Sequence, residues 1–156
     1  MTSSPSILVV DDEQSMRLTL SAILEGEGYR VSACGHTAEA LKLLEESSAD
    51  IVVSDLKLPD GSGLEILTAL NRISPDTIFI LITGHASLET AIEAVNKGAF
   101  AYHVKPIDVD ALITSVRSAV TQQQLLLENR ELLEAVQFSN VELQHGRDAA
   151  IEASRA

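Results

Sequence analysis

Residues 7–13 read Ile-Leu-Val-Val-Asp-Asp-Glu, four apolar residues followed at once by three acids. A short run that is apolar at every position is typical of a strand buried on both faces of a parallel sheet. Residues 78–84, Ile-Phe-Ile-Leu-Ile-Thr-Gly, repeat the pattern, with a polar residue and a glycine directly after the apolar run. The sequence therefore predicts strands that lie inside a covered sheet and end in polar side chains.

Strands and helices alternate around these two runs over the first 106 residues. Short β-branched and apolar runs predict strands at Ile7–Val10, Tyr29–Ala33, Ile51–Val53, Ile78–Ile82 and Ala101–Val104. Helical periodicity predicts helices at Gln14–Glu25, Thr37–Glu46, Gly63–Ile73 and Leu88–Lys97. This alternation predicts an α/β fold, a doubly wound, flavodoxin-like, five-stranded parallel sheet in the order 2-1-3-4-5.

After Pro106 the pattern becomes one long helix, for which Asp108 is the expected N-cap. Residues 111–120 have an apolar face that can cover the sheet, and the helical pattern then continues. We therefore expect a domain at residues 1–120 and a helical extension at residues 121–156, which is a coiled coil or a linker to an output or kinase module.

The extension carries residues, most of them apolar, at alternating spacings of four and three, as the seam of a parallel coiled coil requires. The seam positions are Leu125, Asn129, Leu132, Val136, Ser139 and Leu143. We expect a homodimer through this helix, with Asn129 as a polar residue that sets register.

The composition narrows the classes of function. Eleven basic and 23 acidic residues give a net charge of −12, which argues against direct binding of nucleic acid or anionic membranes. A single cysteine, Cys34, excludes an internal disulfide and a cysteine-based zinc site, and we expect it to be a small core residue. Without a signal peptide or a membrane-spanning run, the chain is expected to be a soluble, cytoplasmic protein.

Polar residues gather where the predicted strands end: Asp11 and Asp12 after the first, Asp55 after the third, Thr83 after the fourth and Lys105 after the fifth. The first and third strands are neighbours in the predicted order, so the three carboxylates should face one pocket. Because these carboxylates repel one another, we expect a Mg²⁺ ion there. A carboxylate nucleophile, Mg²⁺, an ammonium and a hydroxyl are the groups needed for phosphoryl transfer onto Asp55.

The same segments resemble the receiver domain of two-component response regulators, most closely of the nitrogen-regulator type. The resemblance covers about residues 6–120 and rests on residues 7–13, 55–63, 81–85 and 98–106.

This resemblance implies that Asp55 accepts a phosphoryl group from a phosphohistidine on a sensor histidine kinase or phosphotransfer protein. It implies that Asp12, Asp55 and the backbone carbonyl of Lys57 bind Mg²⁺, with Asp11 acting through water.

The resemblance assigns the remaining polar groups as well. Lys105 would contact the phosphoryl group, Thr83 and Tyr102 would be the switch pair, and the Lys105–Pro106 peptide would be cis. Chemistry beyond phosphorylation and dephosphorylation of Asp55 itself is not expected.

Other interpretations stay open at this point. An aspartate-nucleophile phosphatase would carry a second carboxylate two residues after Asp55, where this chain has Lys57. Residues 140–156 resemble the helical run before the dimerisation domain of hybrid histidine kinases, so the chain is alternatively a fragment of such a kinase. Lys57 and His85 either tune dephosphorylation or are solvated rim residues. The histidines His36, His103 and His145 predict no metal site.

Overall fold

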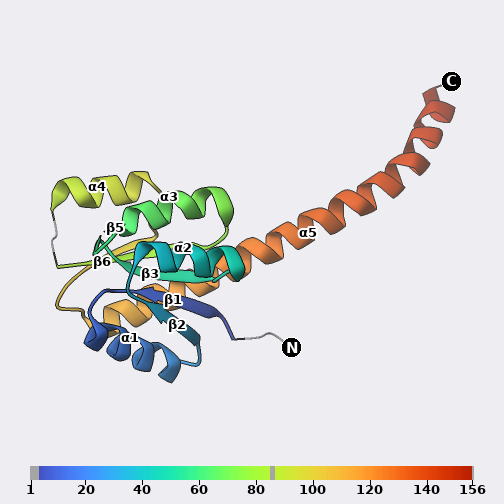
Figure 1. Ribbon diagram of the computed structural model, residues 1–156. Helices are drawn as coiled ribbons and strands as arrows, with labels where there is room; N and C mark the ends of the chain where they lie inside the picture. The colour runs from blue at the N-terminus through green and yellow to red at the C-terminus, as the bar shows by residue number, and fades with distance from the viewer. Residues whose placement is uncertain (1–3, 85–86, 156) are drawn as a thin grey trace. The chain divides into compact units, whose positions relative to one another are not determined.

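The structure is a computed structural model that describes residues 4–84 and 87–155, with side chains as far as Val136. Five parallel strands form one sheet in the order β2-β1-β3-β6-β7, of which Figure 1 labels β1, β2, β3 and β6. These strands are β1 (Ser6–Val10), β2 (Arg30–Cys34), β3 (Ile51–Asp55), β6 (Ile78–Thr83) and β7 (Ala101–Val104). The predicted doubly wound sheet and its 2-1-3-4-5 order are thus confirmed.

Helices cover both faces of the sheet (Figure 1). The helices α1 (Gln14–Gly26) and the first part of α5 (Val109–Arg155) pack on one face. The helices α2 (Thr37–Glu46), α3 (Gly63–Ile73) and α4 (Leu88–Asn96) pack on the other. Side chains alternate along a strand, so Ile7 and Val9 of β1 face α1 and α5, while Leu8 faces α2 and α3. This double cover explains why residues 7–10 of β1 and 78–82 of β6 are all apolar.

The connection from β3 to α3 contains a small hairpin that the sequence analysis missed. Its strands are β4 (Lys57–Leu58) and β5 (Gly61–Ser62), paired antiparallel. Pro59 and Asp60 form the turn, in agreement with the tendency of a Pro-Asp-Gly stretch to turn the chain. Strands of two residues carry no periodicity, so the pattern of apolar residues could not reveal them.

The second strand lies one residue later than predicted. The backbone N–H of Tyr29 donates to the carbonyl of Leu24, so Tyr29 completes the last turn of α1 and does not join the sheet. Cys34 pairs with Val10 as the last residue of β2. It is only 3% exposed, as expected for a small core residue, and burial raises the pKa of its thiol to about 11.

The chain divides into two compact units, Met1–Gln123 and Gln124–Ala156. Asp108 caps α5 as predicted, since its Oδ1 accepts the N–H of Ala111 at 3.1 Å. The last residue of the first unit, Gln123, is a buried amide. Its Nε2 donates to the carbonyls of Asp50 at 2.9 Å and Asp76 at 3.0 Å, in the segments just before β3 and β6. Among the described residues, no helix is long and apolar enough to cross a membrane.

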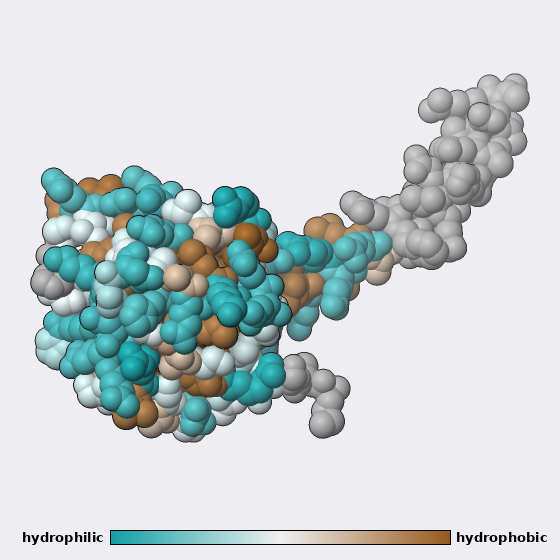
Figure 2. Space-filling view, viewed as in Figure 1, coloured by the Kyte–Doolittle hydropathy of each residue, from teal (hydrophilic) through white to brown (hydrophobic). Residues whose placement is uncertain are grey.

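The second unit consists of the rest of α5, and its apolar side chains from Leu125 to Val136 are exposed. Figure 2 shows them in brown among hydrophilic neighbours in the coloured part of this helix. The predicted seam residues Leu125, Leu132 and Val136 are 54%, 62% and 51% exposed. The side chains of the seam residues Ser139 and Leu143 lie outside the described part of the chain.

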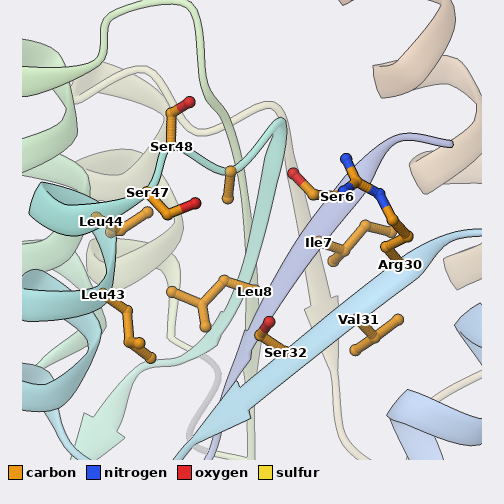
Figure 3. Close-up of a pocket in the computed structure, with 11 residues that line it drawn as sticks. Ser6, Ile7, Leu8, Arg30, Val31, Ser32, Leu43, Leu44, Ser47 and Ser48 are labelled. Carbon is orange, nitrogen blue, oxygen red and sulfur yellow. The ribbon is translucent and has the colours of Figure 1, made fainter. Parts of the chain in front are cut away.

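A pocket of about 220 Å³ lies between the first residues of β1 and β2 and the end of α2. In Figure 3, Ser6, Ser32 and Arg30 come from the two strands, whereas Leu44 and Ser47 come from the end of α2. Because Ser6 and Arg30 begin their strands, this pocket lies at the amino edge of the sheet. It is therefore separate from the carboxyl edge, where the predicted site residues lie.

Candidate functional site

Three acids meet at the carboxyl edge of the sheet. Asp11 and Asp12 follow β1 directly, and Asp55 is the last residue of β3, the strand beside β1. One carboxylate oxygen from each acid lies within 4.8 Å of the other two. The order of the strands, with β1 next to β3, is therefore what brings two distant parts of the sequence into one cluster.

Lys105, which directly follows the edge strand β7, also reaches this cluster. Its Nζ lies 3.0 Å from Asp11 Oδ2 and 2.9 Å from Asp55 Oδ2, so the ammonium bridges the two buried acids. Burial by itself lowers the pKa of Lys105, but the hydrogen bonds and charges of Asp55 and Asp11 outweigh it and raise the pKa above its usual value. The lysine is consequently a fixed positive charge at neutral pH.

Asp11 and Asp12 have different surroundings. Asp11 is 1% exposed, and both of its carboxylate oxygens have partners: Oδ1 accepts the N–H of Glu13 at 2.9 Å, and Oδ2 binds Lys105. The guanidinium of Arg17 donates to the Asp11 carbonyl at 2.7 Å and fixes the backbone there. Asp12 is exposed, so its carboxylate remains open to a ligand from solvent.

This set of donors suits a hard divalent cation. Three carboxylates bring three negative charges and Lys105 brings one positive charge, so the cluster lacks the two charges that Mg²⁺ carries. All the candidate ligand atoms are oxygens, which Mg²⁺ and Ca²⁺ prefer over nitrogen and sulfur.

The hairpin after Asp55 leaves one more oxygen available. The N–H of Gly63 donates to the carbonyl of Leu56 at 2.8 Å. Lys57 and Ser62, which are one residue closer to the turn, lie opposite each other in the ladder. Residues in an antiparallel ladder alternate between pairs that exchange hydrogen bonds and pairs that do not. The Lys57–Ser62 pair is of the second kind, so the Lys57 carbonyl points away from β5 and is not used by the hairpin.

The backbone of Asp55 is held by residues to which the sequence analysis gave no role. Ser54 Oγ donates to the Asp55 carbonyl at 2.9 Å. A Cβ at Gly63 would overlap the same carbonyl oxygen, so α3 can begin against β3 only with glycine at this position. The Gly-Ser-Gly stretch was the visible signal for such a close approach, whereas nothing local marks Ser54.

Thr83 and Tyr102, the predicted switch pair, lie on one face of the sheet. Thr83 ends β6 and is fully buried, and Tyr102 of β7 pairs with Leu81 on that strand. The Tyr102 ring packs against the core under α2, α3 and α4, and its hydroxyl is buried without a hydrogen-bond partner among the described residues. The Lys105–Pro106 peptide is cis, as the resemblance implied.

His36 and His103 are not part of this cluster. His103 Nε2 is 2.8 Å from Ser115 Oγ, between β7 and α5. His36 is an exposed residue near Glu39. His85 and the side chain of His145 lie outside the described residues.

Comparison with known proteins places the chain in a family. The model of the response regulator receiver domain matches residues 7–117. The C4-dicarboxylate transport transcriptional regulatory protein DctD of Rhizobium meliloti is 34% identical over 140 residues, which is 90% of this chain. The chain spans 30% of the length of that relative.

Solved structures give the same assignment. The beryllofluoride-activated NtrC4 receiver domain dimer is 38% identical with a TM-score of 0.73, and the match covers 76% of this chain and 98% of that one. A response regulator protein from Burkholderia pseudomallei, determined with a phosphorylated aspartic acid, a calcium ion and citrate, is 34% identical with a TM-score of 0.68. That match covers 81% of this chain and 75% of the other.

The family match takes in the acidic cluster, Lys105 and the strands that carry them. The chain therefore belongs to the response regulator receiver domains and is a phosphorylation-controlled switch of two-component signalling.

Proposed function

We propose that Asp55 is the residue that is phosphorylated, and that the donor is a phosphohistidine on a sensor histidine kinase or a phosphotransfer protein. The observation that carries this proposal is the double ion pair of Lys105 with Asp55 and Asp11. A carboxylate beside a fixed ammonium, at a water-accessible edge, suits a nucleophile that must tolerate an incoming phosphoryl group. The calcium ion and phosphorylated aspartic acid named for the Burkholderia pseudomallei protein also support it.

In the proposed transfer, an Asp55 carboxylate oxygen forms a bond to phosphorus while the bond from phosphorus to the donor imidazole nitrogen breaks. The imidazole leaves as a neutral ring after taking a proton from solvent. Lys105 then shifts from the carboxylate to the phosphoryl oxygens and offsets their charge. Return to the resting state is hydrolysis, in which water attacks phosphorus and releases inorganic phosphate.

We propose that Mg²⁺ is held by Asp12, Asp55 and the Lys57 carbonyl, with Asp11 acting through water. The two partners already bound to the Asp11 carboxylate and the exposure of Asp12 support this division of roles. When bound, the ion supplies positive charge that lets an anionic phosphoryl group approach an acidic cluster.

We propose Thr83 and Tyr102 as the switch. A phosphoryl group on Asp55 would offer new acceptor oxygens to the Thr83 hydroxyl. Tyr102 lies on the same face of the sheet, and burying its hydroxyl without a partner is costly. The ring should therefore exchange between this buried position and an exposed one, with a balance that depends on where Thr83 lies.

An apolar pocket beside Lys105 supports docking of the phosphodonor at this edge. It has a volume of about 220 Å³ and lies between α1 and the segment after β7, lined by Met16, Ile23, Pro106 and Ile107 among others. An amphipathic helix of the partner would bury its apolar side chains there, which would bring its phosphohistidine close to Asp55.

We propose that the extension joins two copies of the chain and links the receiver to a further module. Its exposed leucines at seam positions support the dimer. The match to DctD covers 90% of the chain and so must continue past Gln123, which favours the linker of a response regulator over that of a hybrid kinase. The phosphatase alternative is not favoured, since Lys57 stands where its second carboxylate would lie.

The decisive experiment is phosphorylation with acetyl phosphate and Mg²⁺, followed by intact-mass analysis. The wild-type chain should gain one acid-labile phosphoryl group, and Asp55→Asn should gain none. Asp110→Asn, which removes an exposed acid from the first turn of α5, is the control and should be labelled like wild type. Labelling of Asp55→Asn at the wild-type level would show that another residue is the acceptor.

A further inference from the structure

Asp60, in the turn of the β4–β5 hairpin, makes a double contact with a helix that lies far from it in the sequence. Its Oδ1 accepts the backbone N–H of Thr37 at 2.7 Å, and its Oδ2 accepts that of Ala38 at 2.9 Å. These residues are the first two of α2, and they precede Asp60 by 23 and 22 positions. One carboxylate therefore joins the hairpin to the start of α2.

The helix needs this contact because it has no cap of its own. His36 occupies the N-cap position, and its side chain makes no capping hydrogen bond. The first N–H groups of a helix lack partners within the helix, and a negative charge there is favourable. The hydrogen bonds from Ala38 and Thr37 lower the pKa of Asp60, so the carboxylate is ionised at neutral pH.

The start of α2 is also tied to the loop that carries Asp11 and Asp12. The N–H of Asp11 donates to the carbonyl of Cys34 at 3.0 Å. The next residue, Gly35, lies beside the acidic pair: a Cβ there would be in ordinary contact with the Asp11 carbonyl oxygen at 3.5 Å and the Asp12 Cα at 3.6 Å, and only 2.9 Å from Arg17 Nη1. The segment leading into α2 is thus in contact with the backbone of the acidic pair.

These contacts form a chain across the acidic cluster. On one side stand Asp11 and Asp12, and on the other stands the hairpin that presents the Lys57 carbonyl. We propose that Asp60 is a positioning residue for divalent-cation binding, which holds the Lys57 hairpin at a fixed place relative to the Asp11–Asp12 loop. This proposal rests on the proposed function, since it assumes that the cluster binds Mg²⁺.

The alternative is that Asp60 only stabilises α2. Two variants separate the roles. Asp60→Ala removes both the helix cap and the hairpin contact. Adding His36→Ser places a hydroxyl at an N-cap position whose extended backbone, φ −137° and ψ 149°, suits a serine cap. The double variant should recover the stability of α2 without recovering the contact between the hairpin and the helix.

Three measurements on the full unphosphorylated chain test this. Calorimetric titration with Mg²⁺ alone should show about a tenfold weaker affinity in Asp60→Ala, the lower end of what supporting partners of metal ligands contribute. Amide hydrogen exchange without metal should show faster exchange in residues 57–62. Thermal unfolding should show a lower midpoint, which His36→Ser restores while the Mg²⁺ affinity and the fast exchange stay as in Asp60→Ala.

The control is Ser87→Ala, which removes the side chain that caps α4. It should lower stability and leave the Mg²⁺ affinity unchanged. Wild-type affinity in Asp60→Ala, or full recovery of affinity in the double variant, overturns the positioning role. A wild-type chain that binds no Mg²⁺ overturns the proposed metal site instead. Unchanged amide exchange in residues 57–62 of Asp60→Ala overturns, independently of any metal, the proposal that Asp60 holds the hairpin in place.

Discussion

Most leucines of the receiver are buried, whereas the described leucines of the extension are exposed. In the receiver, Leu20, Leu70 and Leu112 are at most 1% exposed, because two helical layers close over a central sheet. In the extension, Leu132 and Leu133 are 62% and 61% exposed. The two regions have similar apolar residues, so the difference arises from what surrounds them and not from composition.

This contrast shows that an apolar side chain is buried only where another helix or sheet covers it. A sheet with helices on both faces supplies its own layers, whereas a single helix has nothing within itself to cover an apolar stripe. The receiver should therefore be stable without the extension, while the leucines of the extension contribute only when a second helix covers them.

The largest expected effect comes from making the same substitution in both regions. Leu112→Ala should lower the free energy of unfolding of the receiver by about 2–5 kcal/mol, because it leaves a cavity between α5 and the sheet. Leu132→Ala should leave receiver unfolding unchanged and weaken only dimerisation. Urea unfolding and sedimentation of both variants test this. Equal losses of unfolding free energy in the two variants would contradict the contrast.

An intermediate effect is expected from removing the extension. A chain that ends at Gln123 should keep its unfolding midpoint and its phosphorylation by acetyl phosphate, since the contacts of the receiver end there. It should sediment as a monomer at micromolar concentrations where the full chain is a dimer. If the truncated chain remains a dimer, the interface lies on the receiver and the seam prediction is wrong.

The smallest expected effect concerns pH and is confined to the receiver. Burial lowers the pKa of His103 below 6.5, with partial opposition from the charge of Asp108. The unfolded chain therefore binds a proton more readily than the folded one, and the stability that neutral His103 allows is lost as the pH falls below about 6.5. Unfolding measured between pH 5 and 7.5 should show a flatter pH dependence in His103→Gln. Helicity of the extension at pH 7.5 should match the wild type in this variant.

The sequence was most informative about the apolar runs inside the sheet. The runs Ile7–Val10 and Ile78–Ile82 predicted β1 and β6 within one residue, and the polar residues after them predicted which side chains would meet once the strand order was known. The end of β3 was predicted two residues early, because Ser54 and Asp55 are polar although they are buried in the sheet. The strand β2 was predicted one residue early, because Tyr29 looks like a strand residue when it closes α1.

The sequence did not reveal the tertiary contacts, between residues far apart in the chain, that support the site and its domain. Asp60 was visible only as a turn residue, and its role depends on helix N–H groups more than twenty positions away. Gln123 resembled the other glutamines around it, yet it alone among Gln122, Gln123 and Gln124 is buried. Such roles follow from tertiary contacts, which no local pattern encodes.

The buried amide of Gln123 has a mechanical consequence for α5. It donates to the carbonyls of Asp50 and Asp76 at the amino edge of the sheet, opposite the edge where Lys105 lies. The fifteen residues from Val109 to Gln123 span about 22 Å and pack on one face of the sheet. A shift of the helix along its axis, or a rotation about it, would have to break both of these hydrogen bonds. Gln123 therefore resists movement of α5 at the point where the receiver ends.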